Sequence, residues 1–380
     1  MSKLKEYFPL IQERETLLQK IQSSKQMTET FNKWKPEQQE EFLDFCTGVR
    51  GVKILYDSFF KEVLNPEYAP ERLESLLSVV LKRKVRIVRI LPNDSTRIAD
   101  ETSLLITDII VELEEGSLAN VEIQKIGYTF PGERSACYSS DMLLRQYKRV
   151  RSDKGEKFSY NDVKNVYLIV IYENSPREFK KLPKDYYHYG KQVFDTGLKL
   201  NMLQEFIMIP LDIFRRNMEN KSIETHLEAW LTFLTNDNPE RVIELITQYP
   251  EFKPMYETVY QMCQNVERVM NMFSEELRIL DRNTVKYMIE EQEKEIKRQK
   301  AELEGKEQQL EEKNQQLEEK DQQLGEKDQQ LEEKDQRLNA YRKIQRNAIE
   351  NLLKENMTVE KIAAILSCEV SYVEEIKREM

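Results

Sequence analysis

The chain has 380 residues, of which 39% are hydrophobic and 33% are charged, and its formal net charge is −10. This length accommodates one large α/β domain, or two smaller ones, with appendages. The acidic balance excludes a protein that coats nucleic acid over its whole surface, so any DNA contact has to use a local basic patch. The four cysteines stand apart without a CxxC pair, which excludes a zinc knuckle or a disulfide framework and favours a cytoplasmic protein. The longest apolar run, Val166 to Tyr172, is too short to cross a bilayer, so no membrane partner is expected.

The spacing of apolar residues predicts the elements in chain order. Residues 1–66 and 71–84 are predicted to be helical, because their apolar positions recur at helical spacing. Three strands are predicted next, at Val85–Leu91, Leu104–Leu113 and Leu118–Ile126. A helix at Gly132–Arg151 and two strands at Asn165–Tyr172 and Phe206–Ile209 follow, and residues 222–290 return to helix. A hairpin combined with a crossover helix implies an α/β fold with a mixed sheet and helices packed on it.

From about residue 290 the sequence becomes a run of near-identical heptads. Leucine recurs every seven residues at Leu303, Leu310, Leu317, Leu324, Leu331 and Leu338. A coiled coil needs two apolar positions per heptad, and the second position here is polar in either register. We therefore predict a long helix with weak self-association, and a homo-oligomer through this helix is one interpretation of it.

The last forty residues regain complexity and contain two short apolar segments around residues 367–370. They are similar to a helix-turn-helix, with Ser371 and Glu374 in a capping-box pattern. Because this segment carries equal numbers of acidic and basic side chains, a small docking or dimerisation bundle is an equally good interpretation. We accordingly divide the chain into residues 1–66 (helical), 67–215 (α/β core), 216–289 (helical extension), 290–340 (heptad helix) and 341–380 (helix-turn-helix-like tail).

The segment with the clearest chemistry is TDIIVELEEGSLANVEIQK. Asp108 is a lone acid in one apolar strand, and Glu122 and Gln124 lie on one face of the next strand because side chains alternate. A three-residue loop at Glu114–Gly116 would place Asp108 opposite Glu122. Two carboxylates and an amide at one point can bind a hard divalent cation such as Mg²⁺. The alternative is that these side chains merely solvate the outer face of a hairpin.

The ordered D…ExQ pattern, preceded by ERLESLL and followed by ERSACYSSDMLLRQY, resembles the recombination-promoting nuclease and putative transposase family of the PD-(D/E)XK nuclease group. The segment Tyr56–Lys61 and the stretch from Arg134 to Ser139 support the resemblance, which covers about residues 50–290. It implies a restriction-endonuclease-like fold and a DNA endonuclease that uses Mg²⁺ or Mn²⁺.

The resemblance also implies roles for individual residues. Asp108 and Glu122 would be the metal ligands, and Gln124 would stand where the motif usually has a lysine. Glutamine can orient water or phosphate but cannot supply positive charge, and Lys125 faces the other side of the strand. Glu74, on the helix before the first strand, is either an auxiliary carboxylate or an ordinary solvated helix residue.

Two segments are candidates for DNA contact. Arg145, Lys148 and Arg149 share one face of the predicted helix and can neutralise phosphates, unless they form an ordinary solvated face. Residues 180–191 mix lysines with three tyrosines, which either stack on exposed bases or pack as a loop over the sheet edge.

Three functions therefore compete. The first is a metal-dependent DNA endonuclease linked to recombination or transposition. The second is a DNA-binding or assembly protein that retains an inactive nuclease fold, and the third is a coiled-coil adaptor capped by a globular part.

Overall fold

The computed structural model describes residues 2–91, 108–125 and 131–380. The chain forms two compact units, Met1–Glu291 and Gln292–Met380. The predicted strand residues 104–107 and Ile126 lie outside the described residues.

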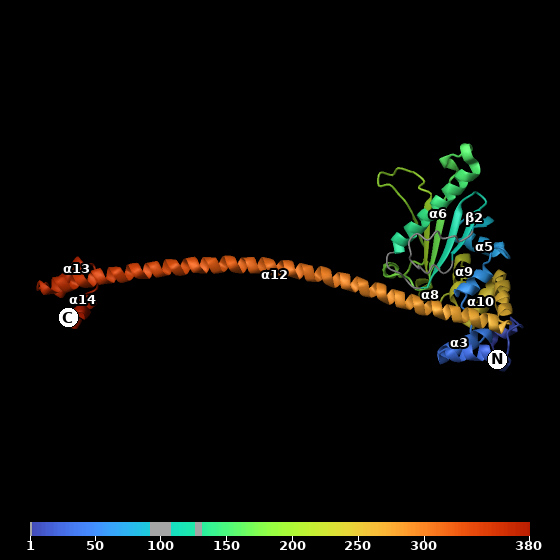
Figure 1. The fold of residues 1–380 in the computed structure, drawn as a ribbon, viewed down its shortest axis with the longest axis horizontal. Coiled ribbons are helices and arrows are strands. Elements are labelled where there is room, and N and C mark those ends of the chain that lie inside the picture. Colours follow the sequence, from blue (N-terminus) through green and yellow to red (C-terminus); the bar gives the residue numbers. More distant parts are fainter. Residues whose placement is uncertain (1, 92–107, 126–130) are drawn as a thin grey trace. The chain divides into compact units, whose positions relative to one another are not determined.

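A mixed sheet of six strands in the order β1-β2-β3-β4-β6-β5 forms the centre of the first unit (Figure 1). The strands are β1 (Ile87–Leu91), β2 (Asp108–Leu113), β3 (Leu118–Gln124), β4 (Val166–Tyr172), β5 (His188–Lys191) and β6 (Gln204–Pro210). The β1–β2–β3 and β5–β6 pairs are antiparallel, whereas β3, β4 and β6 run parallel. The predicted α/β fold with a mixed sheet and flanking helices is confirmed.

Helices before, between and after the strands complete the first unit. Those before it are η1 (Lys3–Glu6), α1 (Arg14–Gln22), α2 (Lys25–Lys33), α3 (Pro36–Cys46), α4 (Asp57–Val63) and α5 (Pro70–Val80). Those between strands are α6 (Pro131–Lys154), η2 (Gly155–Lys157), η3 (Tyr160–Asp162) and α7 (Arg177–Lys180). Those after the sheet are α8 (Leu211–Met218), α9 (His226–Thr235), α10 (Pro239–Gln248), η4 (Pro250–Phe252), α11 (Lys253–Met262) and the start of α12 (Val266–Lys354).

The two faces of the sheet pack against different partners. One face, which includes Val121 and Ile169, joins the large core made with α3, α5, α9 and α11. The opposite face packs against α6, where Met142 contacts Leu118 and Val166. Because the residues of β3 are all buried, this strand has helical layers on both sides.

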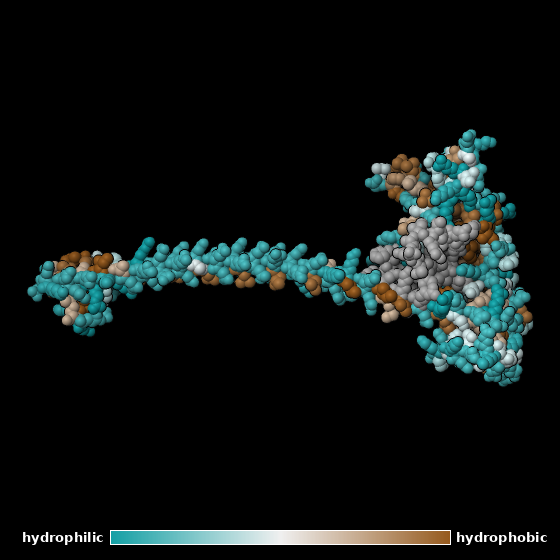
Figure 2. Space-filling model, in the orientation of Figure 1, coloured by the Kyte–Doolittle hydropathy of each residue, from teal (hydrophilic) through white to brown (hydrophobic). Residues whose placement is uncertain are grey.

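The second unit contains most of α12 together with α13 (Val359–Ile365) and α14 (Val370–Glu379). A small core around Ile349, Ile362 and Val373 holds the three helices together. The heptad leucines are 48–62% exposed along this long helix, and Figure 2 shows them as a row of apolar side chains on a hydrophilic surface. The predicted long helix and short helical tail are confirmed.

Two local predictions are wrong. The helix α14 begins at Val370 after an N-cap at Glu369, so Ser371 lies inside the helix and its hydroxyl donates to the Glu369 carboxylate instead of capping. Strand β5 lies in the basic and aromatic segment 180–191, for which the sequence predicts no strand. Its four residues alternate without an apolar run, and pairing with β6 rather than sequence pattern makes it a strand.

Candidate active site

A tight hairpin brings Asp108 and Glu122 opposite each other. Leu113 donates its backbone N–H to the Ser117 carbonyl at 2.8 Å, which closes a three-residue loop. Gly116 occupies the left-handed position of this loop with φ +87°, a conformation that glycine adopts without strain. The resulting register pairs Asp108 with Glu122, as the loop length predicts. The description covers the backbone of Asp108 but not its side chain.

The polar residues of β3 lie on the sheet face that α6 covers. Asn120, Glu122 and Gln124 are 3%, 1% and 7% exposed. The Gln124 side-chain amide donates to Glu122 Oε1 at 2.6 Å. A solvated outer face is therefore the wrong interpretation of Glu122 and Gln124. Burial of a carboxylate is costly, and such groups are concentrated at functional sites.

Tyr172 at the end of β4 lies next to the polar residues of β3. Together with Asn120, Glu122 and Gln124 it is here called the polar cluster. Parallel pairing places Tyr172 beside Gln124, and its side chain is fully buried. Burial and the negative charge of Glu122 raise the pKa of Tyr172, whereas Ser135 and the Arg134 guanidinium act in the opposite direction. Tyr172 thus keeps its proton, and its strand position lies beside Gln124, two residues along β3 from Glu122.

The first turns of α6 bring a positive charge to the same cluster. Arg134 is half-buried, acts on the pKa of Tyr172, and donates to the Tyr138 hydroxyl at 3.3 Å. The neighbouring Ser135 hydroxyl donates to the Pro131 carbonyl at 2.7 Å. Sequence reasoning used Arg134 only as a family match and did not assign it to the site. The signal that could have found it is the spacing of Arg134 and Tyr138 by one helical turn, directly after the ExQ strand.

Lys125 lies on the other side of the strand end, as side-chain alternation predicts. It forms an ion pair with Glu276 of α12, and both side chains are 2% exposed. Its ammonium group also lies 5.1 Å from the centre of the Tyr56 ring. The Lys125 side chain therefore faces the helical layer. It does not take the place of the motif's usual lysine, whose position Gln124 occupies.

The sequence of the chain matches one known protein family. The sequence profile of the PD-(D/E)XK nuclease family transposases matches residues 54–288, more than half of the chain. The chain belongs to this family. No curated protein matches it. Family membership indicates a nuclease kind of enzyme and a role in transposition, and it makes DNA the expected substrate. None of the described helices is long and apolar enough to cross a membrane.

Glu74, the possible auxiliary carboxylate, lies apart from the polar cluster. Its Oε1 accepts the backbone N–H of Ile87 at 2.8 Å. Ile87 pairs with Leu113, five residues along β2 from Asp108, which corresponds to about 17 Å of strand. Glu74 thus stabilises the start of β1, and the structure does not bring it to Glu122.

The three basic residues of α6 have different environments. Arg145 forms an ion pair with Asp141 at 2.7 Å, and Arg149 forms one with Glu112 of β2 at 3.2 Å. Lys148 is exposed. Of the three, Lys148 is the side chain most accessible to a phosphate, and DNA contact by all of them stays a prediction.

The donor atoms of the cluster fit a divalent cation of the kind that this family uses. Asn120, Glu122 and Gln124 carry carboxylate and amide oxygens on one face of β3, which are the ligand types that Mg²⁺ and Mn²⁺ prefer, and the backbone of Asp108 pairs with Glu122 on the neighbouring strand. Among the residues whose side chains are described, no group of three or more His, Cys, Asp and Glu side chains is placed to hold a metal. The pair Asp108–Glu122 is smaller than such a group and includes one undescribed side chain.

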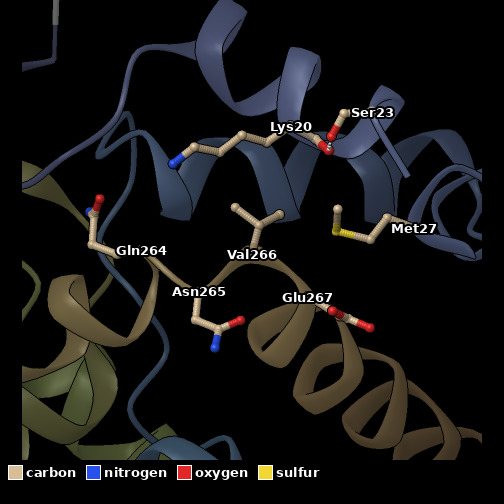
Figure 3. Close-up of a pocket in the computed structure, with 7 residues that line it drawn as sticks. All are labelled: Lys20, Ser23, Met27, Gln264, Asn265, Val266 and Glu267. Atoms are coloured by element: carbon tan, nitrogen blue, oxygen red, sulfur yellow. Dashed lines mark hydrogen bonds between the residues drawn. The ribbon is translucent and has the colours of Figure 1, made fainter. Parts of the chain in front are cut away.

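A depression elsewhere in the first unit lacks this chemistry. It has a volume of about 530 Å³ and lies between α1, α2 and the start of α12 (Figure 3). Lys20 and Glu267 are its only charged lining residues, and the Lys20 ammonium donates to Gln12 at 2.6 Å. The amides of Gln264 and Asn265 also line it, but Glu267 has no second carboxylate beside it, and one acid alone is a poor metal or acid–base site.

Proposed function

We propose that the chain is a metal-dependent DNA endonuclease that hydrolyses phosphodiester bonds during recombination or transposition. The observation that carries this proposal is the buried Glu122–Gln124 pair on the α6 face of the sheet, opposite the backbone of Asp108. A carboxylate that is 1% exposed has no solvation role. Its position in the D…ExQ pattern of a nuclease family supports a catalytic one.

Asp108 and Glu122 would hold Mg²⁺ or Mn²⁺, and Asn120 lies on the same face between the loop and Glu122. When bound, such a cation lowers the pKa of water and stabilises negative charge on a phosphate. Gln124 would fix the orientation of Glu122, because its side-chain amide donates to Oε1.

Arg134 would provide the positive charge that Gln124 cannot supply. A guanidinium donates two parallel hydrogen bonds to phosphate oxygens and stays charged at every relevant pH. Its hydrogen bond to Tyr138, which packs against the apolar cluster that contains Tyr172, supports a position near the polar cluster. Tyr172, with its raised pKa, keeps its proton and can donate a hydrogen bond to a phosphate oxygen.

Access of DNA requires a change from the described conformation. Because Glu122 is 1% exposed, a phosphodiester can reach its carboxylate only when the groups that cover this face move apart. Cleavage would therefore proceed from a less populated open state, which lowers the apparent affinity for productive DNA binding.

Nicking of supercoiled plasmid with added Mg²⁺ or Mn²⁺ tests the proposal. We expect Asp108→Ala and Glu122→Gln each to reduce the metal-dependent nicking rate at least about a hundredfold. The control is Glu114→Gln, which removes an exposed carboxylate from the hairpin loop and should cleave normally. Salt-sensitive DNA retention by the wild-type protein without any nicking would instead support a non-catalytic DNA-binding protein with an inactive nuclease fold.

We further propose that the heptad helix associates with a second copy of the chain. If leucine occupies position d, Lys313 lies at g and Glu318 at the following e, so a parallel partner pairs opposite charges along the stripe. The acids at position a, such as Asp321, face their counterparts and weaken the seam. The expected product is a weak parallel homodimer.

A further inference from the structure

The end of α6 and the turns that follow it form a projection that the proposed active site does not use. Residues 147–164, here called the α6 arm, extend beyond the hairpin end of the sheet (Figure 1). Gln146 fixes the base of the arm, because its amide donates to the Gly116 carbonyl at 3.1 Å and its Oε1 accepts the Lys164 N–H at 2.8 Å. These two hydrogen bonds attach the base of the arm to the β2–β3 loop and to the residues just before β4.

Three aromatic rings gather on the arm. Tyr147 and Tyr160 stack with centroids 6.1 Å apart and an interplanar angle of 14°. Phe158 meets both rings edge-on, with centroids 5.5 Å away in each case. A small local core would bury its members, but Tyr160 is 77% exposed. Its ring therefore offers a flat face to solvent on a rigid support.

The arm that carries these rings is rich in basic residues. The arm contains six basic and three acidic residues, in a chain whose net charge is −10. Tyr147, Arg151 and Lys154 follow one helical stripe, and the Arg151 guanidinium lies 5.7 Å from the Tyr147 ring centre. Lys148 and Lys157 are exposed, and neither forms an ion pair with another described residue.

We propose that the α6 arm binds unpaired DNA bases, with Tyr160 as the stacking platform and the basic side chains on the adjoining phosphates. Exposed aromatic rings among cations are the combination that binds single-stranded nucleic acid. The proposal rests on the proposed nuclease function for the choice of DNA as the ligand.

The geometry of α6 sets the distance between the arm and the cluster. Thirteen residues of one helix separate Arg134 from Tyr147, which corresponds to about 20 Å. At 3.4 Å per step, this length spans about six base pairs. DNA that is cleaved at the cluster would thus present a single-stranded segment to the arm about six base pairs away, and a junction of duplex and single strand is the expected substrate.

Binding of the full chain to fluorescent DNA in EDTA tests the arm without cleavage. The probes are a blunt duplex and the same duplex with a single-stranded tail of about ten nucleotides. We expect Tyr160→Ala to weaken binding of the tailed duplex about tenfold and Tyr160→Phe to bind normally. The matched control is Tyr68→Ala, which removes a tyrosine that is 79% exposed outside the arm. Quenching of 2-aminopurine in the tail should be lost in Tyr160→Ala and kept in Tyr160→Phe.

Several results would overturn the proposal. They are unchanged binding of the tailed duplex by Tyr160→Ala, an equal loss for tailed and blunt DNA, and a loss in Tyr160→Phe as large as in Tyr160→Ala. Absence of any DNA binding by the wild-type protein would overturn it as well. Failure of plasmid nicking alone would refute only the nuclease function, because the arm is tested by binding in EDTA.

Discussion

The buried ion pair between Lys125 and Glu276 permits a quantitative test of how the strand end is held. Glu276→Gln would leave the Lys125 ammonium in a site where it is 2% exposed. Removal of one partner from a buried pair costs about 3–5 kcal/mol, because the other charge stays desolvated. We therefore expect the free energy of unfolding of the first unit to fall by this amount.

A neighbouring residue provides the matched control. Glu275 forms an ion pair with Arg278 at 2.5 Å on the same helix, but their side chains are 48% and 61% exposed. Exposed pairs contribute less than about 1 kcal/mol. Glu275→Gln should therefore change the free energy of unfolding by no more than that. The double variant Lys125→Met with Glu276→Leu removes both charges and should be neutral or more stable by about 1–4 kcal/mol.

Urea denaturation followed by tryptophan fluorescence measures these differences. Both tryptophans of the chain, Trp34 and Trp230, are buried in the first unit. The Trp34 ring lies 5.0 Å from Phe273, three residues before Glu276, so its emission reports on the start of α12. The reasoning is refuted if Glu276→Gln costs no more than Glu275→Gln, or if the double variant is as unstable as the single one.

Three further changes test other parts of the structure. Arg134→Ala should reduce kcat/KM for plasmid nicking about a hundredfold with little change in DNA affinity in EDTA, and Arg134→Lys should recover part of the rate; equal rates for all three proteins would exclude a role in cleavage. Burial raises the pKa of Glu41, but hydrogen bonds from Lys53 and Tyr56 lower it further, so the net pKa is lowered. Stability from this group is present above its unfolded pKa of about 4.3 and is lost as pH falls through the folded value. Glu41→Gln should thus cost about 1–3 kcal/mol in urea denaturation at neutral pH, and a cost that does not shrink in acid would contradict this. Replacement of Leu317 and Leu324 together by Glu should shift the chain to monomer in sedimentation, whereas the same change at two glutamines off the leucine stripe should not; identical sedimentation of both variants would rule out the leucine stripe as the interface.

All strands except β5, and the register of the β2–β3 hairpin, were predictable because local rules determine them. Alternation of side chains and a glycine at the third loop position are enough to pair Asp108 with Glu122. The apolar run of β4 predicts a strand buried on both faces, and the leucine repeat predicts the long helix. In each case the signal lies within a few residues of the element.

Contacts between distant segments were not predictable in the same way. Glu122 is buried on the sheet face against which α6 packs, and no pattern within β3 distinguishes a covered face from a solvated one. The partner of Lys125 lies about 150 positions away at Glu276. The role of Glu74 likewise depends on another element, because its carboxylate accepts the backbone N–H of Ile87 in β1.

The ion pair on one face at the end of β3 helps to hold the polar residues on the opposite face in position. Glu122 and Gln124 face α6, whereas Lys125 faces the helical layer and binds α12. A catalytic carboxylate has to be held within about 0.5 Å of its working position, which requires a strand end that does not fray. The parallel bond from the Glu173 N–H to the Gln124 carbonyl, 2.8 Å long, fixes the backbone at that point. The next residue, Lys125, is held in place by the ion pair between its side chain and Glu276. A costly buried charge pair next to a costly buried carboxylate is therefore consistent with selection for position, since an apolar pair at Lys125 and Glu276 would be at least as stable.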